Sequence, residues 1–373
     1  MTYASARSLR CYRLFAVVLA FVLLSGGGVA LAATPGTELW AMRFGIPSDA
    51  TAQSIGVSPD GSAVYVTGYA NGSGSGYDFV TLAYDSVTGA ELWLKRYDGP
   101  AASYDVAYAL GVSPDGSTVY VTGTSRGLTS DVDYATIAYD ASTGDRLWIR
   151  RYNGTGNSFD YAFALAVSPD GSAVFVTGRG EGASSGPDYV TIAYDATTGV
   201  RSWTKTYNGP GNGTDVPSAI RVSQDGSMVV VTGQSYGTTT SFDFATFVYD
   251  AATGTKLWFK RFNGPANGGD AATTLGISPD GSKVFLAGVS GEDLYSTFDY
   301  STVVYDASNG ALLWTKRFDG KANDFDWVYG LGVSPDGSTV FVTGLTTGPV
   351  RQGTSQRPYA AGTTSVSRPV RTS

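Results

Sequence analysis

An internal repeat with a period of about 55 residues constrains the fold of this 373-residue chain more than any other feature. The turn Ser-Pro-Asp-Gly recurs, with aspartates at Asp60, Asp115, Asp170, Asp280 and Asp336, and Asp225 continues the series within Ser-Gln-Asp-Gly. A tryptophan recurs with nearly the same period, at Trp40, Trp93, Trp148, Trp203, Trp258 and Trp314. A unit of this length buries its apolar face only by stacking against its neighbours, so the period predicts a repeat architecture.

Each repeat unit is predicted to form four short strands. In one unit the apolar, β-branched and aromatic segments are residues 162–167, 173–177, 189–194 and 201–207. Turns rich in Pro, Asp and Gly separate them, and no segment after residue 32 has helical periodicity. Four antiparallel strands per unit are typical of β-propeller blades. A β-helix has much shorter repeats, and separate sandwich domains need about 100 residues each.

Counting strands predicts an all-β propeller with six blades. Residues 39–44 form a lone fourth strand, five complete units follow, and residues 327–333 and 339–343 supply two more strands. We therefore expect the N-terminal strand to complete the last blade, which also removes exposed sheet edges. A third strand is expected after Gly344, but the pattern fails there. Either the last blade lacks a strand, or the architecture has more blades and this chain stops early.

The first 32 residues have the order of a secretory signal peptide. Arg7, Arg10 and Arg13 precede the apolar residues 14–24, and small residues follow up to Ala32. An apolar run of this length is too short to span a bilayer, which needs about 20 residues. We expect cleavage after Ala32, no stable membrane insertion, and a secreted or extracytoplasmic protein of the bacterial envelope. Residues 33–346 are then the propeller and 347–373 a degenerate or flexible tail.

Composition excludes several kinds of catalytic site. The chain has no His and a single cysteine, Cys11, which lies within the predicted signal. Imidazole-based triads, zinc-thiolate sites and disulfide scaffolds are therefore excluded from the exported part. A net charge of -7 also argues against a nucleic-acid partner.

Residues 138–148 resemble the tryptophan-docking motif of pyrroloquinoline-quinone propellers, Ala-x-Asp-x-x-Thr-Gly-x-x-x-Trp, and residues 83–93 and 193–203 match it too. The Val-Tyr-Val-Thr-Gly strand at 119–123 also resembles the secreted bacterial SBBP-type propeller repeat. The resemblance implies that each Trp of the series docks on the adjacent blade. It does not extend to the reaction, because those dehydrogenases have eight blades, a calcium-held quinone and often a vicinal disulfide. We therefore predict no cofactor, and the sequence argues against pyrroloquinoline quinone.

One rim of the propeller is predicted to carry an aspartate before each inner strand. These six residues are Asp49, Asp105, Asp160, Asp215, Asp270 and Asp326. They are candidate Ca²⁺ ligands, because carboxylate oxygens suit that ion. The alternative, which we favour, is that each carboxylate accepts backbone N–H groups and holds its own turn.

Residues that break the repeat on the same rim are candidates for ligand binding, because binding sites are usually built on loops of a rigid scaffold. They are Trp327, Arg126, Arg179, Glu181, Tyr236, Glu292, Asp293 and Tyr295. We expect no catalytic residue and a non-catalytic scaffold that binds a protein, a glycan or a small ligand through this rim. The alternatives are a quinoprotein-like oxidoreductase or other propeller enzyme, and a structural repeat protein of the cell envelope.

Overall fold

The computed structural model describes residues 38–44, 49–72, 76–182, 184–291, 297–320, 325–346, 365–366 and 370–371. The chain divides into two compact units, Met1–Leu39 and Trp40–Ser373, and every strand lies in the second. The predicted signal peptide and its cleavage site fall outside the described residues. Among the described residues, no helix has the length and apolar character to cross a membrane.

The described residues form no helix and 24 strands, which make six four-stranded antiparallel sheets. The first three sheets comprise β1 (Ala50–Val57), β2 (Ala63–Asn71), β3 (Tyr77–Asp85) and β4 (Glu91–Tyr97); β5 (Asp105–Val112), β6 (Thr118–Arg126), β7 (Val132–Asp140) and β8 (Arg146–Tyr152); β9 (Tyr161–Val167), β10 (Ala173–Glu181), β11 (Pro187–Asp195) and β12 (Arg201–Tyr207). The last three comprise β13 (Asp215–Val222), β14 (Met228–Tyr236), β15 (Phe242–Asp250) and β16 (Lys256–Phe262); β17 (Asp270–Ile277), β18 (Lys283–Gly291), β19 (Phe298–Asp306) and β20 (Leu312–Phe318); β21 (Asp326–Val333), β22 (Thr339–Thr346), β23 (Ser365–Val366) and β24 (Val370–Arg371).

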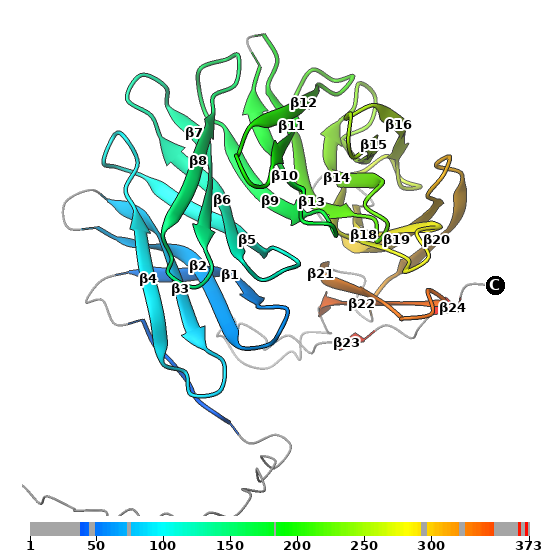
Figure 1. Cartoon of the computed structure of the whole chain (residues 1–373). Helices are drawn as coiled ribbons and strands as arrows, with labels where there is room; N and C mark the ends of the chain where they lie inside the picture. The colour runs from blue at the N-terminus through cyan, green and yellow to red at the C-terminus, as the bar shows by residue number, and fades with distance from the viewer. Residues whose placement is uncertain are drawn as a thin grey trace, which may run out of the picture. The chain divides into compact units, whose positions relative to one another are not determined.

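Successive sheets follow one another as the blades of a propeller, which confirms the predicted fold class. We number them blade one to blade six in chain order. The strands of blades one to five pair in sequence order, and the first strand of each blade contacts the first strand of the next. Figure 1 shows this succession from the blue β1 to the orange β21 and β22. The predicted strands of blade three coincide with β9 to β12 within a few residues at each end.

The Ser-Pro-Asp-Gly turns form the hairpins between the first and second strands, as predicted. In blade three, Asp170 accepts hydrogen bonds from the hydroxyl of Ser168 at 2.6 Å and the backbone N–H of Ser172 at 3.0 Å. These hydrogen bonds lower the pKa of Asp170 to about 2. Gly171 has a φ of 73°, which only glycine adopts without cost.

The tryptophans of blades one to four each dock their blade on the next one, as the resemblance implied. The indole N–H of Trp148 in β8 donates to the carbonyl oxygen of Ala196, in the turn after β11 of the next blade, at 2.9 Å. In that turn Gly199 has a φ of 67°, and a Cβ there would lie 2.7 Å from the Trp148 ring. The equivalent hydrogen bonds are donated by Trp40, Trp93, Trp203 and Trp258.

Blade six is completed differently from the expectation. Residues 38–44, predicted as its outer strand, form no strand, although Trp40 still docks on blade one through Ser86. Instead, β23 and β24 lie beside β22, at the register positions that third strands hold in the other blades. Because these two strands have two residues each, they offer a fourth strand little backbone to pair with. The remainder of the predicted flexible tail lies outside the described residues.

Blades one and six are not packed as the other neighbouring blades are. At Gly111 of blade two, a Cβ would lie 2.7 Å from Leu165 of blade three. At Gly332, the equivalent glycine of blade six, a Cβ would meet nothing within 4 Å. In agreement, Ile55 and Val57 of blade one are 70% and 56% exposed. The first and last blades therefore expose apolar surface of a kind that the other blades bury at their junctions.

Candidate functional site

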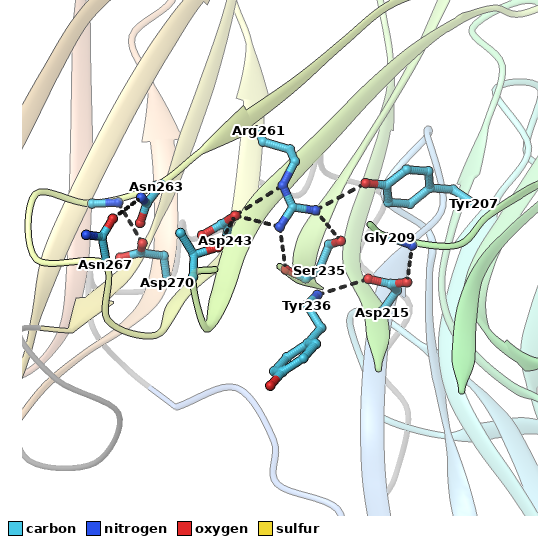
Figure 2. Close-up of polar contacts among 12 residues, drawn as sticks. Tyr207, Gly209, Asp215, Ser235, Tyr236, Asp243, Arg261, Asn263, Asn267 and Asp270 are labelled. Carbon is cyan, nitrogen blue, oxygen red and sulfur yellow. Dashed lines mark hydrogen bonds and ion pairs between the residues drawn. The ribbon is translucent and has the colours of Figure 1, made fainter. Parts of the chain in front are cut away.

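The aspartates that precede the inner strands hold their own loops. Figure 2 shows Asp215, whose carboxylate accepts the backbone N–H groups of Gly209 and Tyr236, the latter at 3.0 Å. Asp160 accepts hydrogen bonds from the backbone N–H groups of Gly154 and Glu181 in the same way. The five that are buried and accept such bonds are Asp105, Asp160, Asp215, Asp270 and Asp326. This is the turn-holding role that we favoured over Ca²⁺ binding.

Asp49 differs from those five residues, because it is exposed at the start of the first blade. The structure does not gather the six aspartates into one site, since each belongs to a different blade. Two of them lie in groups of three carboxylates with oxygens within 4.8 Å of one another; the groups are Asp78, Asp98 and Asp105, and Asp299, Asp319 and Asp326. In each group one carboxylate is already ion-paired with an arginine of its blade. Binding of Ca²⁺ at these residues stays a prediction.

Buried carboxylates make the stability of the fold depend on pH. Burial raises the pKa of Asp160 and of Asp270 from 3.8 to about 6. Between about pH 4 and pH 6 the folded chain therefore binds more protons than the unfolded chain, and its stability falls as pH rises. We expect the melting temperature to be a few degrees higher at about pH 4.5 than at pH 7. Calorimetry of the double variant Asp160→Asn, Asp270→Asn should show a smaller difference; an unchanged one would contradict this assignment.

A second polar contact recurs on this rim, between an arginine near the end of the fourth strand and an aspartate near the start of the third. In blade four, Arg261 donates to Asp243 and to the carbonyl oxygen of Ser235 at 2.9 Å (Figure 2). It also donates to the hydroxyl of Tyr207, on the preceding blade, at 3.2 Å. The same ion pair is formed by Arg96, Arg151 and Arg317 with Asp78, Asp133 and Asp299. These pairs were not predicted, although their spacing of 18 residues recurs in the sequence.

Aromatic side chains of blades one to three form a continuous surface on the same rim. Phe159, Tyr161 and Phe163 stack in a row, with ring centroids 6.4 and 6.2 Å apart. Phe163 continues to Tyr108 of blade two at 6.0 Å. The row extends through Tyr104, Tyr77 and Tyr69 of blades two and one. We call these seven residues the aromatic surface.

None of the seven residues of the aromatic surface was predicted as a binding residue. Phe163 and Tyr108 occupy a β-bulge of the inner strand, where other blades have Gln53, Ser218, Thr273 and Tyr329. A comparison of blades at this position could have found them, because they break the repeat. Arg179, which was predicted, lies over the ring of Tyr161 at 4.6 Å. It therefore lies beside the aromatic surface.

The other predicted ligand-binding residues are scattered over the rim. Trp327 stacks on Phe325 at 5.6 Å and is half-buried, so it belongs to a smaller aromatic group on blade six. Arg126 pairs with Asp131 of its own loop at 3.6 Å, and Tyr236 packs on Phe242 at 5.4 Å. Glu181 ends β10 beside Asp160. The remaining three, Glu292, Asp293 and Tyr295, lie outside the described residues.

The inner strands do not fit a calcium-held quinone. Such a group needs several carboxylate or amide oxygens around the axis of the propeller. Of the six described side chains at the inner-strand bulge, only Gln53 supplies one, and the hydroxyls of Ser218 and Thr273 already donate to carbonyl oxygens of the next blade. The buried rim carboxylates accept backbone N–H groups of their own loops. We therefore derive no step through a quinone.

Comparison with known families decides the relationship that the blade motif indicated. Residues 25–246 and 247–348 match the PQQ-like repeat family described as outer membrane protein assembly factor BamB. The chain belongs to this family. The BamB match agrees with the tryptophan-docking resemblance, whereas the secreted SBBP-type repeat stays a prediction. No curated protein matches the chain.

Solved structures that resemble the chain carry names of unrelated kinds. Hydrazine synthase of Kuenenia stuttgartiensis matches with a TM-score of 0.54 and 17% identity over 84% of this chain and 80% of that one. The WD40 repeats of RRP9 match at 0.52 and 12% identity, over 81% and 75%. The periplasmic gluconolactonase PpgL of Pseudomonas aeruginosa matches at 0.50 and 15% identity, over 89% and 87%. At these identities the likeness shows the fold alone, and this fold supports unrelated functions.

Proposed function

We propose that this chain is an exported, non-catalytic propeller scaffold of the bacterial envelope that binds a protein partner through its aromatic surface. The observation that carries the proposal is the gathering of seven aromatic rings from three blades on one rim. Aromatic side chains are enriched at the centres of protein interfaces, because they offer large apolar area at a low entropic cost. The family description, an outer membrane assembly factor, supports the envelope location and a protein partner.

The aromatic surface is partly open to a partner. Phe159 and Tyr104 are 41% and 38% exposed, and the other five rings are half-buried. Five of its rings lie in or just before the inner strands β5 and β9, and Tyr69 and Tyr77 lie in β2 and β3, so the surface rests on strands rather than on long loops. Arg179 adds a guanidinium beside the rings. The combination favours a partner with apolar or aromatic side chains and some polar groups.

Binding of peptides tests this function. The probes are synthetic peptides that cover the strands of outer-membrane β-barrel proteins, measured by fluorescence anisotropy against the purified chain. We expect a subset to bind, and the double variant Phe159→Ser, Tyr161→Ser to bind that subset at least tenfold more weakly, which is about 1.4 kcal/mol. Leu147→Ser is the matched control, because it removes an exposed apolar side chain of β8 from outside the aromatic surface.

Three outcomes would overturn the proposal. Binding to a glycan array with no peptide binding would make the partner a carbohydrate. Dye reduction after addition of pyrroloquinoline quinone and Ca²⁺ would make the chain an oxidoreductase. Absence of binding to both the peptides and the glycan array would favour a structural repeat protein of the envelope.

A further inference from the structure

Blades two and four each contain a site in which an arginine guanidinium of the chain is bound by the same set of acceptors. In blade four, the guanidinium of Arg261 donates to Oδ2 of Asp243, to the carbonyl oxygen of Ser235, and to the hydroxyl of Tyr207. In blade two, Arg151 makes the same contacts with Asp133 at 2.7 Å, with the carbonyl oxygen of Ser125 at 2.8 Å and with Tyr97 at 3.2 Å. Both arginine side chains are mostly buried.

Blade three lacks this arginine. Thr206 occupies the position in β12 that Arg151 and Arg261 hold in β8 and β16. The acceptors remain: Asp188 opens the third strand and pairs in register with Gly180, as Asp133 pairs with Ser125 and Asp243 with Ser235. Tyr152 holds the position of Tyr97 and Tyr207 at the end of the preceding blade.

The carboxylate of Asp188 is held as in the filled sites. The hydroxyl of Ser185 donates to its Oδ2 at 2.8 Å, as Ser130 does to Asp133 in blade two at the same distance. Asp188 is half-buried, whereas Asp133 and Asp243 are buried beneath their arginines. Thr206 is exposed. The position of the missing guanidinium is therefore open to solvent.

The electrostatic surroundings also favour a cation. Burial raises the pKa of Asp188, and the charges of Asp215 and Glu181 raise it further, so three carboxylates act on this region. In blade four burial raises the pKa of Asp215, and the positive charge of Arg261 lowers it in part. Thr206 supplies no such charge to Asp188.

We propose that blade three holds an open guanidinium site, formed by Asp188, the carbonyl oxygen of Gly180 and the hydroxyl of Tyr152, which takes an arginine side chain of a bound peptide. The inference rests on the proposed function, because Glu181 and Arg179 join this site to the aromatic surface along β10. Arginine is the ligand rather than lysine, because the filled copies use a planar fork with several donors. The partner peptide therefore places an arginine beside its apolar contact with the rim.

Calorimetric titration with blocked tripeptides tests the site directly. The probes are N-acetyl-Gly-Arg-Gly-amide and the same peptide with citrulline, which keeps the shape of arginine and removes its charge. We expect the arginine peptide to bind at least tenfold more tightly. Thr206→Arg, which supplies the arginine of the other blades, and Asp188→Asn should each weaken binding at least tenfold. Ser202→Arg adds the same side chain at an exposed position of the same strand and should leave binding within twofold.

A measurement of stability supports the same site without any ligand. Thr206→Arg should raise the melting temperature, because it completes an ion pair that four blades already have, whereas Ser202→Arg should not. Equal binding of the arginine and citrulline peptides, or undiminished binding by Thr206→Arg, would overturn the proposal. Binding of free L-arginine but not of the blocked peptide would show that the ligand is the amino acid and overturn the peptide source.

The two proposals can fail separately. Phe159→Ser, Tyr161→Ser should retain the affinity for the arginine tripeptide, because that probe has no apolar side chain to place on the rings. Loss of tripeptide binding by this variant would show that the guanidinium site is not a distinct site. If the aromatic surface binds barrel-strand peptides equally well with and without arginine, only the guanidinium proposal fails.

Discussion

Trp148→Ala should destabilise the chain by about 3–5 kcal/mol, the usual cost of removing a large buried aromatic side chain. Trp148 is only 6% exposed, and it packs on Tyr120 of its own blade and Tyr194 of the next one. Its loss also leaves the carbonyl oxygen of Ala196 without the indole donor. Urea unfolding followed by tryptophan fluorescence and by circular dichroism measures the change in the free energy of unfolding.

Trp40→Ala is the matched control for that variant. Its indole makes the same hydrogen bond, to the carbonyl oxygen of Ser86 at 2.9 Å, but the ring is only half-buried against blade one. We therefore expect less than half of the destabilisation seen with Trp148→Ala. Equal losses would show that docking of the indole on the next blade does not depend on the packing described here.

Arg261→Ala should destabilise the chain by about 3 kcal/mol, because removal of one partner leaves a buried charge without compensation. Asp243 is 4% exposed, and Arg261 provides its ion pair as well as a link to Tyr207 of the preceding blade. The same urea titration at pH 7 measures this loss.

A second substitution separates the charge from the packing. In Arg261→Ala, Asp243→Asn the unpaired carboxylate is gone, so part of the stability should return. A double variant that is less stable than Arg261→Ala would contradict the argument. Thr206 shows that a blade tolerates the absence of this arginine, but there the aspartate is half-buried rather than buried.

Most of the fold could be predicted from the sequence, because the same turn and strand motifs recur in successive units of the repeat. The aspartate and glycine of the Asp170 turn and the aromatic periodicity around Trp148 predict hairpins and strands directly. The last blade could not be predicted, because its third strand comes from residues near 366 and 370 that carry no blade motif. Backbone pairing with β22 depends little on side-chain identity, so the sequence pattern does not predict β23 and β24.

The candidate site was predicted only in part, for a related reason. Arg179 and Trp327 broke the repeat in the loops and strands that were compared, and both lie in aromatic groups. Tyr108 and Phe163 were missed because the inner-strand bulge brings together residues of adjacent blades, which depends on the position of one blade against the next. Thr206 was missed because it matters only as the position at which other blades have an arginine. This is evident only when blade three is compared with blades two and four, which have Arg151 and Arg261 there.

A crystal structure of the chain tests the central claim most directly. The account predicts six four-stranded antiparallel sheets, with the tryptophans of the first four docked on carbonyl oxygens of the next sheet, and with Thr206 at the register position where other blades have an arginine paired with the aspartate equivalent to Asp188. Two sheets packed face to face as a sandwich, a helical segment within residues 50–346, or an arginine from elsewhere in the chain already bound to Asp188 would contradict it.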